Sequence, residues 1–447
     1  MNLVGRHQVL WDYLRGSLWV LPSLSIVVFL AAGAVLSRVA ISEDSPLWGL
    51  VFQGTAGDAR QLLIVVSATM ITVTGLVFGL TVVALQIASA QYSPRLLRNF
   101  MRDRGTQLVL SIFVGAFAYS TAGLHTVGVQ RSGQQAFVPR LAVSGSLALG
   151  VASIGVLVYF IHHLAHSIQI DTIISDIERE THHVIDDLYP DQVQARGVEE
   201  RCPDPPSGAI VVRSDRSGYI QTVEPAALVE VATRHDLVVR LARRAGDHVV
   251  AGTPIAWAWQ PSGDRPSAPP ELRAALHDAV HIGFERTMLQ DVLFGLRRLV
   301  DIANKALSPA INDPYTAIQA MQQLSVLLCT LAGRRLGDRL CHDEQETLRV
   351  AVPLPDFAEY LLRGTAQIRR AGAREPAVAR SLIQLLRDVG DSTFRQDRRA
   401  TCARHIWLVL DDAKRETSQP ADLELVLADG TAALSALEAD HPQATGG

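Results

Sequence analysis

The chain has 447 residues, of which 48% are hydrophobic and 19% charged, and its formal net charge is −4. The negative charge and the lack of a long basic run argue against a nucleic-acid partner. The four cysteines form neither a paired extracellular framework nor a C-x-x-C metal motif, so we expect reduced thiols.

Four uncharged apolar runs lie within the first 161 residues, and the rest of the chain has none. Each run is long enough to cross a hydrocarbon core of about 30 Å, which takes roughly 20 helical residues. Because a backbone in lipid must hydrogen-bond to itself, four spanning helices are predicted. The first run is too long for the core of a cleaved signal peptide, so we interpret it as a retained signal anchor. The runs are 18–37, 61–90, 106–130 and 141–161.

The arginines that flank these runs predict their orientation, since basic residues near helix ends stay on the cytoplasmic side. One side carries Arg6, Arg15, Arg95, Arg98, Arg102 and Arg104, and the other carries Arg38, Arg60, Arg131 and Arg140. The first group is larger and clustered. We therefore expect both termini to be cytoplasmic, with the spans in a bacterial inner membrane.

The second run carries a stripe of small and hydroxyl side chains, one at every seventh position. One interpretation is a pore lined by these hydroxyls in a homo-oligomer, with a G-x-x-x-G pair allowing close helix contact. Ordinary packing between membrane helices is the alternative. An amide in the same run is a further pore-lining candidate, because an amide near the bilayer needs a partner, which a neighbouring helix could also supply. The stripe is Ser67, Thr74, Thr81 and Ala88, the glycines are Gly75 and Gly79, and the amide is Gln86.

Three histidines, His162, His163 and His166, follow the fourth run. His162 and His166 are one helical turn apart, a spacing at which imidazoles can share a metal ion or sense pH. No H-E-x-x-H arrangement accompanies them, so a zinc hydrolase is excluded. The alternative is that they anchor the helix at the membrane interface.

Beyond the fourth run, residues 160–188 keep helical spacing, which predicts a stalk helix, and a polar, proline-rich linker follows. Short β-type runs then occupy 208–260. Residues 246–254 resemble a turn of biotinyl and lipoyl carrier barrels. Because this segment has no lysine, a carrier role is excluded and only a small barrel-like fold is suggested.

The last 180 residues or so are predicted to form a helical bundle. Its densest polar stretch is 286–314, where charged side chains are candidates for an anionic ligand or a subunit contact. The alternative for part of it is an ion-pair ladder along one helix, with a helix N-cap before Pro314. The candidates are Arg297, Asp301, Lys305, Asn312 and Asp313. Further helices are expected at 314–331, 356–371, 375–389, 402–415 and 421–437, with a strand at 348–354.

Two segments, 79–104 and 286–314, together with 160–163, resemble a bacterial family of predicted integral membrane proteins of unknown function. The resemblance covers nearly the whole chain, and it implies membrane insertion without implying an activity or catalytic residues.

The predicted fold is mainly α, with a four-helix transmembrane region, a long stalk helix, a small β barrel-like domain and a C-terminal cytoplasmic helical bundle. The predicted segments are an N-terminus (1–17), membrane helices (18–161), a stalk (162–190), a linker (191–207), a β domain (208–263) and a helical domain (264–447).

We expect a homo-oligomeric ion channel or transport protein in contact with the lipid bilayer, whose cytoplasmic part assembles or gates it. A membrane-anchored sensor or scaffold without transport is the alternative. The chain has no P-loop, G-x-G-x-x-G, G-x-S-x-G or kinase signature, so no enzyme activity, catalytic residue or cofactor is predicted.

Overall fold

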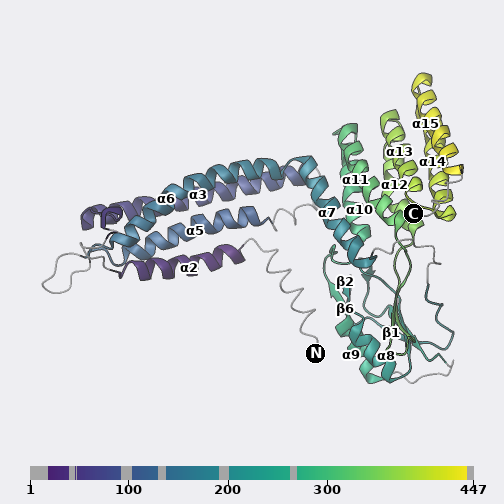
Figure 1. Cartoon of the computed structure of the whole chain (residues 1–447), viewed down its shortest axis with the longest axis horizontal. Coiled ribbons are helices and arrows are strands. Elements are labelled where there is room, and N and C mark those ends of the chain that lie inside the picture. Colours follow the sequence, from purple (N-terminus) through teal and green to yellow (C-terminus); the bar gives the residue numbers. More distant parts are fainter. Residues whose placement is uncertain are drawn as a thin grey trace. The chain divides into compact units, whose positions relative to one another are not determined.

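The computed structural model describes residues 19–39, 46, 48–91, 103–128, 137–190, 201–261 and 269–439 (Figure 1). The chain divides into an N-terminal unit that ends at Thr172 and a C-terminal unit that begins at Ile173. Several sequence predictions lie outside the described residues: the N-terminus 1–17, the linker part 191–200, and Arg6, Arg15, Arg95, Arg98, Arg102 and Arg131.

Four long helices form the N-terminal unit: α2 (Val20–Leu36), α3 (Ala56–Gln91), α5 (Arg104–Leu124) and α6 (Arg140–Ser167), with a short 3₁₀ turn at Trp48–Leu50. Within the described ranges, three helical segments are long and apolar enough to cross a membrane, namely Ala56–Ile87, Arg104–Leu124 and Arg140–Ser167. The described helix α2 has 17 residues and is shorter. The fourth span therefore stays a prediction.

Helix α5 is the central helix of this unit, because α2, α3 and α6 all contact it. In α5, 67% of an apolar stretch of 18 residues is buried, against 22% of the corresponding stretch in α3 and in α6. Glycines let the helices come close: a Cβ at Gly33 would lie 2.6 Å from the carbonyl oxygen of Tyr119, and one at Gly115 would lie 2.8 Å from the ring of Phe29. The outer faces of α3 and α6 are apolar and exposed, as lipid-facing surfaces require.

The predicted continuous stalk helix is instead two helices. Helix α6 ends at Ser167, and α7 (Ile170–Leu188) follows after a two-residue break. One face of α7 is buried, including Ile177 and Ile185. Gly295 belongs to the helix α10 (Val292–Ala306), and a Cβ on it would overlap Thr181 of α7. Helices α7 and α10 are therefore in close contact at this point. Helix α7 is therefore a packed part of the C-terminal unit along most of its length.

Eight strands in two sheets follow: β1 (Ile210–Arg213), β2 (Gly218–Val223), β3 (Val238–Leu241), β4 (His248–Val249), β5 (Pro254–Trp259), β6 (Val280–Gly283), β7 (Arg339–His342) and β8 (Leu348–Val352). The sheet orders are β1-β5-β3-β8-β7 and β4-β2-β6, and the β3–β8 pair is parallel. Both sheets and the helices α8 (Ala226–Arg234) and α9 (Pro270–Ala279) share one apolar core. Strands β6, β7 and β8 lie beyond residue 263, the predicted end of the β domain, and they pair with strands that lie before it.

The remaining helices stack as antiparallel pairs. Helices α10, α12 and α14 are neighbours in one layer, and α11, α13 and α15 are neighbours in the other (Figure 1). The predicted helices are present, but α14 begins six residues earlier than predicted. Their bounds are α10 Val292–Ala306, α11 Pro314–Gly333, α12 Phe357–Ala371, α13 Pro376–Asp391, α14 Gln396–Glu416 and α15 Pro420–Glu438.

Candidate functional site

The hydroxyl stripe of α3 faces the other helices of the same chain. Ser67 is 8% exposed and Thr81 is 6% exposed. The hydroxyls of Thr74 and Thr81 donate to the carbonyls of Met70 and Val77, four residues earlier on α3. Within one chain this placement matches the packing alternative, because the chain's own helices cover the face that was predicted to line a pore between copies.

Ser67 lies at the level of a tyrosine on α5. The two helices run in opposite directions, and a Cβ on Gly123 of α5 would lie 3.3 Å from Leu63 of α3. One turn further along α3 comes Ser67, and one turn earlier on α5 comes Tyr119. Both side chains are therefore at the same depth in the N-terminal unit.

Helix α6 adds a hydroxyl at the same depth. The hydroxyls of Ser120 on α5 and Ser146 on α6 are 2.6 Å apart. A Cβ on Gly145, which precedes Ser146, would overlap the hydroxyl of Tyr119. We call Ser67, Tyr119, Ser120 and Ser146 the hydroxyl layer.

Two members of the hydroxyl layer have no hydrogen-bond partner among the described residues. The Ser67 Oγ and Tyr119 Oη atoms are both buried. The Ser120 hydroxyl, in contrast, is within hydrogen-bond distance of both the carbonyl of Ala116 and the hydroxyl of Ser146, and in the second contact either hydroxyl can donate. A buried hydroxyl without a partner loses the hydrogen bonds that water would give it, which costs roughly 1 to 3 kcal/mol. Such groups call for an explanation, such as a bound water or solute.

Apolar clusters lie on both sides of the hydroxyl layer. Towards the start of α3, the cluster is Ala59, Leu63, Val127 and Val143, with Phe52 packed against it. In the other direction, the cluster is Met70, Val77, Val109, Leu110, Phe113, Ala116 and Phe160. The layer is thus a polar section in an otherwise apolar helix interior.

Polar side chains lie at both ends of the N-terminal unit, namely two arginines at one end and a helix-capping aspartate at the other. At one end Arg60 donates to the carbonyl of Val127 at 3.3 Å, and Arg140 donates to the carbonyl of Phe52 at 2.8 Å. At the other end Asp103 caps α5 by accepting from the backbone N–H of Thr106 at 3.0 Å.

His163 is the histidine of the cluster that has an acidic partner. Its Nε2 is 2.8 Å from Asp103 Oδ2. Burial raises the pKa of Asp103, but hydrogen bonds from Thr106 and His163 outweigh it, so this pKa lies below its ordinary value. His162 and His166 are exposed and stack on each other with ring centres 6.4 Å apart. Among the described residues no group of three metal-ligating side chains occurs.

The glycine pair and the amide of α3 lie on the outside of the unit. Gly75, Gly79 and Gln86 are exposed, and a Cβ at either glycine would meet nothing within 4 Å. The glycines therefore pack against none of the described helices, and among these helices they leave a face open to lipid or to a second copy. Homo-oligomer formation stays a prediction.

The polar candidates of 286–314 are separated into local roles. Arg297 Nε is 2.7 Å from Asp301 Oδ1, which is the ion pair of the alternative interpretation. Asp313 caps α11 by accepting from the backbone N–H of Thr316 at 3.1 Å, and the side-chain hydrogen bond from Thr316 lowers its pKa. Lys305 is exposed at the last turn of α10. Asn312 is exposed in the following turn and has a positive φ of 51°. The structure does not gather these side chains into one site.

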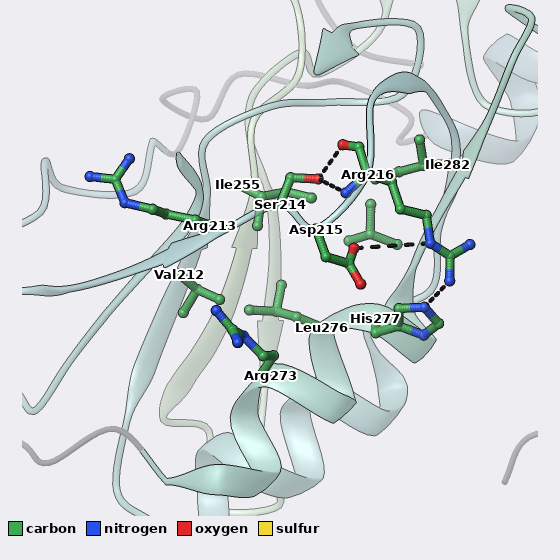
Figure 2. Close-up of a pocket in the computed structure, with 11 residues that line it drawn as sticks. Val212, Arg213, Ser214, Asp215, Arg216, Ile255, Arg273, Leu276, His277 and Ile282 are labelled. Carbon is green, nitrogen blue, oxygen red and sulfur yellow. Dashed lines mark hydrogen bonds and ion pairs between the residues drawn. The ribbon is translucent and has the colours of Figure 1, made fainter. Parts of the chain in front are cut away.

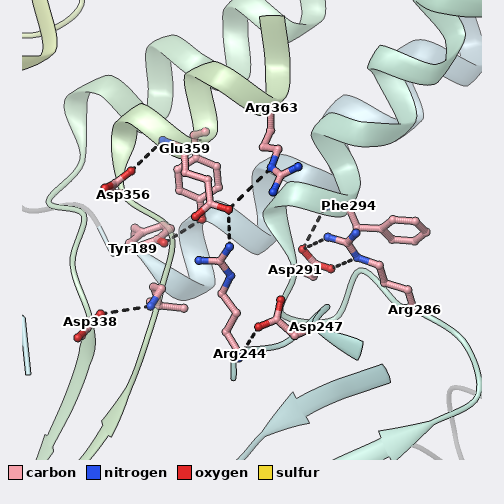
Figure 3. A network of polar contacts seen from close by, with 12 residues as sticks. Tyr189, Arg244, Asp247, Arg286, Asp291, Phe294, Asp338, Asp356, Glu359 and Arg363 are labelled. Carbon is pink, nitrogen blue, oxygen red and sulfur yellow. Dashed lines mark hydrogen bonds and ion pairs between the residues drawn. The ribbon is translucent and has the colours of Figure 1, made fainter. Parts of the chain in front are cut away.

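Sequence reasoning missed a polar network between the β strands and the helices (Figure 3). Arg244, after β3, binds Glu359 of α12 at 2.6 Å. Arg286 binds Asp291, the N-cap of α10, at 3.0 Å. Burial raises the pKa of Asp291, although Arg286 opposes this effect. The network connects the β strands to α10 and α12. The pair of Arg244 and Glu359 is far apart in the chain, so no local sequence pattern contains it, whereas Arg286 and Asp291 are five residues apart.

A small pocket of about 40 Å³ lies beside the β1–β2 turn and α9 (Figure 2). Its floor is apolar, and its rim carries both charges. Arg216 contacts His277 and lies 4.0 Å from Asp215, which stands between Arg216 and Arg273 in the view. Three arginines, Arg213, Arg216 and Arg273, stand against the single carboxylate of Asp215, so the rim carries a net positive charge.

Comparisons with known proteins place the chain. Residues 15–388 match the family described as "Predicted membrane protein (DUF2254)". The uncharacterized proteins Rv1290c of Mycobacterium tuberculosis and Mb1321c of Mycobacterium bovis are each 47% identical to the chain over 440 residues, covering 98% of it and 84% of their own length. No solved structure matches the chain. The chain belongs to this family of predicted membrane proteins.

Proposed function

We propose that the chain is a membrane transport protein in which a small polar solute crosses between α3, α5 and α6 of a single copy. The observation that carries this proposal is the pair of buried hydroxyls without partners, Ser67 Oγ and Tyr119 Oη. Both belong to helices that are long and apolar enough to span a membrane.

A transport role explains why the hydroxyl layer is polar. A helix interior that serves only as an anchor needs no polar section, and apolar side chains at these positions would fill the space without a desolvation cost. A solute that leaves water needs groups that replace its hydration shell, and intramembrane polar residues facing a bundle interior commonly provide them. In the state described here, the apolar clusters on both sides close the layer.

Two further parts of the proposal concern assembly. The open face around Gly75 and Gly79 is suited to close contact with α3 of a second copy, since glycines allow membrane helices to approach. The arginine-rich loop supports an inner-membrane orientation with the C-terminal unit in the cytoplasm, where it assembles or gates the membrane helices.

A membrane-anchored sensor or scaffold is the second candidate. Large apolar side chains on the last helix pair of the C-terminal unit favour it: Trp407 of α14 is 57% exposed and Leu425 of α15 is 51% exposed. Exposed residues of this kind are frequent in protein contacts.

Solute flux into proteoliposomes tests the first proposal. We expect the purified chain to pass at least one member of a panel of inorganic anions, inorganic cations and small neutral solutes, and a Ser67→Ala, Tyr119→Phe variant to lose most of that flux. The matched control is Thr69→Val, Thr72→Val, because these hydroxyls are exposed on the same helix and each donates to a carbonyl four residues earlier. Equal flux in both variants, or no flux above empty liposomes, would overturn the proposal and favour the scaffold.

A further inference from the structure

We propose that the solute is a small inorganic anion, an inference that rests on the transport function proposed above. Two independent features carry it: the kind of groups that the hydroxyl layer offers, and the charges at the end of the helices nearest to that layer.

The hydroxyl layer offers free donors and no negative charge. Ser67 and Tyr119 each present a hydroxyl that neither donates to nor accepts from a described residue. A dehydrated cation is bound by a ring of carbonyl oxygens or by carboxylates. The carbonyls of α3, α5 and α6 are engaged in helix hydrogen bonds, and the layer contains no carboxylate. An anion, in contrast, is stabilised by O–H donors alone.

The nearer end of the helices is positive. Arg60 and Arg140 donate to the carbonyls of Val127 and Phe52, and both of these residues belong to the apolar cluster that covers the hydroxyl layer. The two guanidinium groups are thus held at the border of that cluster. Neither pairs with a carboxylate among the described residues, so their charges act on whatever enters.

Acidic groups also lie near both ends. Asp58, on the first turn of α3, accepts hydrogen bonds from the backbone N–H and the hydroxyl of Thr55, at 2.9 and 2.7 Å, and these bonds leave its carboxylate charged. At the far end Asp103 caps α5 and pairs with His163. A small anion therefore meets two arginines and one carboxylate, then an apolar seal, and then two free hydroxyls.

The test is the reversal potential of the full-length protein in a planar bilayer across a KCl gradient. We expect a reversal potential near that of chloride, and a current that falls severalfold when Arg60→Gln and Arg140→Gln are combined. Arg38→Gln is the matched control, because Arg38 is an exposed arginine just after α2.

The possible outcomes separate the two proposals. A reversal potential near that of potassium, or flux of neutral solutes alone, would overturn the anion inference and leave the transport function intact. A current that the Arg60→Gln, Arg140→Gln variant retains in full would also overturn it, provided that the variant elutes as the natural chain does. The absence of any flux in the liposome panel would overturn both proposals.

Discussion

Two adjacent arginines of α14 hold the ends of two other helices. Arg398 donates to the carbonyls of Ala332 and Arg334 at the end of α11, at 2.7 and 2.9 Å. Arg399 donates to the carbonyl of Leu437 at the end of α15, at 2.8 Å. The last carbonyls of a helix lack partners within it, and they carry partial negative charge. A buried guanidinium supplies both donors and the complementary charge.

We expect Arg399→Met to loosen α15 by about 2 to 3 kcal/mol, the magnitude of hydrogen bonds to a charged group. Hydrogen exchange would measure this loss as faster exchange in α15, with α10 unchanged. The control is Arg404→Met, since Arg404 is exposed on the same helix. Unchanged protection of α15 in Arg399→Met would show that the guanidinium does not hold its end.

Gly246, in the turn after β3, lies against Asp291, the N-cap of α10. Its φ is +90°, and an added Cβ would overlap the carboxylate of Asp291. Gly252 also has a positive φ, of +84°, but an added Cβ would meet nothing within 4 Å. The positive φ favours glycine at both positions. At Gly246 a side chain would in addition overlap Asp291.

This contrast gives a paired prediction. We expect Gly252→Ala to cost about 1 kcal/mol from backbone strain alone, and Gly246→Ala to cost at least about 1 kcal/mol more. Thermal unfolding of the two variants in the same detergent measures the difference as a larger drop in melting temperature for Gly246→Ala. Equal drops would mean that Asp291 moves aside freely, and that the network in Figure 3 is not rigid.

At the scale of elements, the contact between α12 and α14 contains a histidine. The Nδ1 atom of His405 is 3.2 Å from the hydroxyl of Thr365. Burial, and then the charges of Arg404 and Arg369, lower the pKa of His405 from 6.5 to about 4. The unfolded chain therefore binds this proton more readily than the folded chain does. The stability that the neutral histidine contributes is complete above pH 6.5 and is lost as the pH falls from about 6.5 towards 4.

We therefore expect α12 and α14 to exchange their amide hydrogens faster at pH 5 than at pH 7.5, after correction for intrinsic rates. A His405→Gln variant keeps a polar side chain that does not titrate, so its pH dependence in these helices is expected to be smaller. Identical pH dependence in the natural chain and in His405→Gln would show that other groups govern the contact.

Sequence patterns predicted helices well where the apolar face of the helix itself is enough to define its bounds. Helices α11, α12, α13 and α15 begin and end within two residues of their predicted bounds. The start of α14 was missed because its first turns are polar, and the burial of Arg398 and Arg399 depends on carbonyls of other helices. Strand β6 was missed because a short strand is defined by the strand it pairs with, and its partner β2 is distant in sequence. Strand β7 was missed although its partner β8 follows it directly in the chain.

The candidate site shows the same limit. The seven-residue spacing of the α3 stripe was visible in the sequence, but which face of the helix is covered depends on α5 and α6. The pairing of Ser120 with Ser146 joins residues on two helices, so no local pattern contains it. The histidine prediction chose His162 and His166 by their spacing, whereas His163 has a partner because α5 begins beside it.

At the scale of the whole molecule, the division between the two units falls near the break between α6 and α7. Helix α7 is tied to the C-terminal unit by polar contacts as well as by its apolar face. Asp186 binds Arg334 at 2.6 Å, Glu180 binds Arg298 at 3.0 Å, and the hydroxyls of Tyr189 and Tyr360 are 2.9 Å apart. Arg298 and Arg334 are 4% and 9% exposed. Removing their partners would leave buried charges uncompensated, which costs about 3 to 5 kcal/mol for a buried pair.

These contacts predict where the chain can be cut. A fragment of residues 169–447 keeps α7, so we expect it to be soluble and monodisperse by size-exclusion chromatography, with a cooperative unfolding transition. A fragment of residues 191–447 lacks α7 and exposes the apolar surface that Ile177 and Ile185 cover, so we expect it to aggregate. If the shorter fragment folded as stably as the longer one, α7 would be a dispensable connector, and its contacts with the C-terminal unit would contribute little to stability.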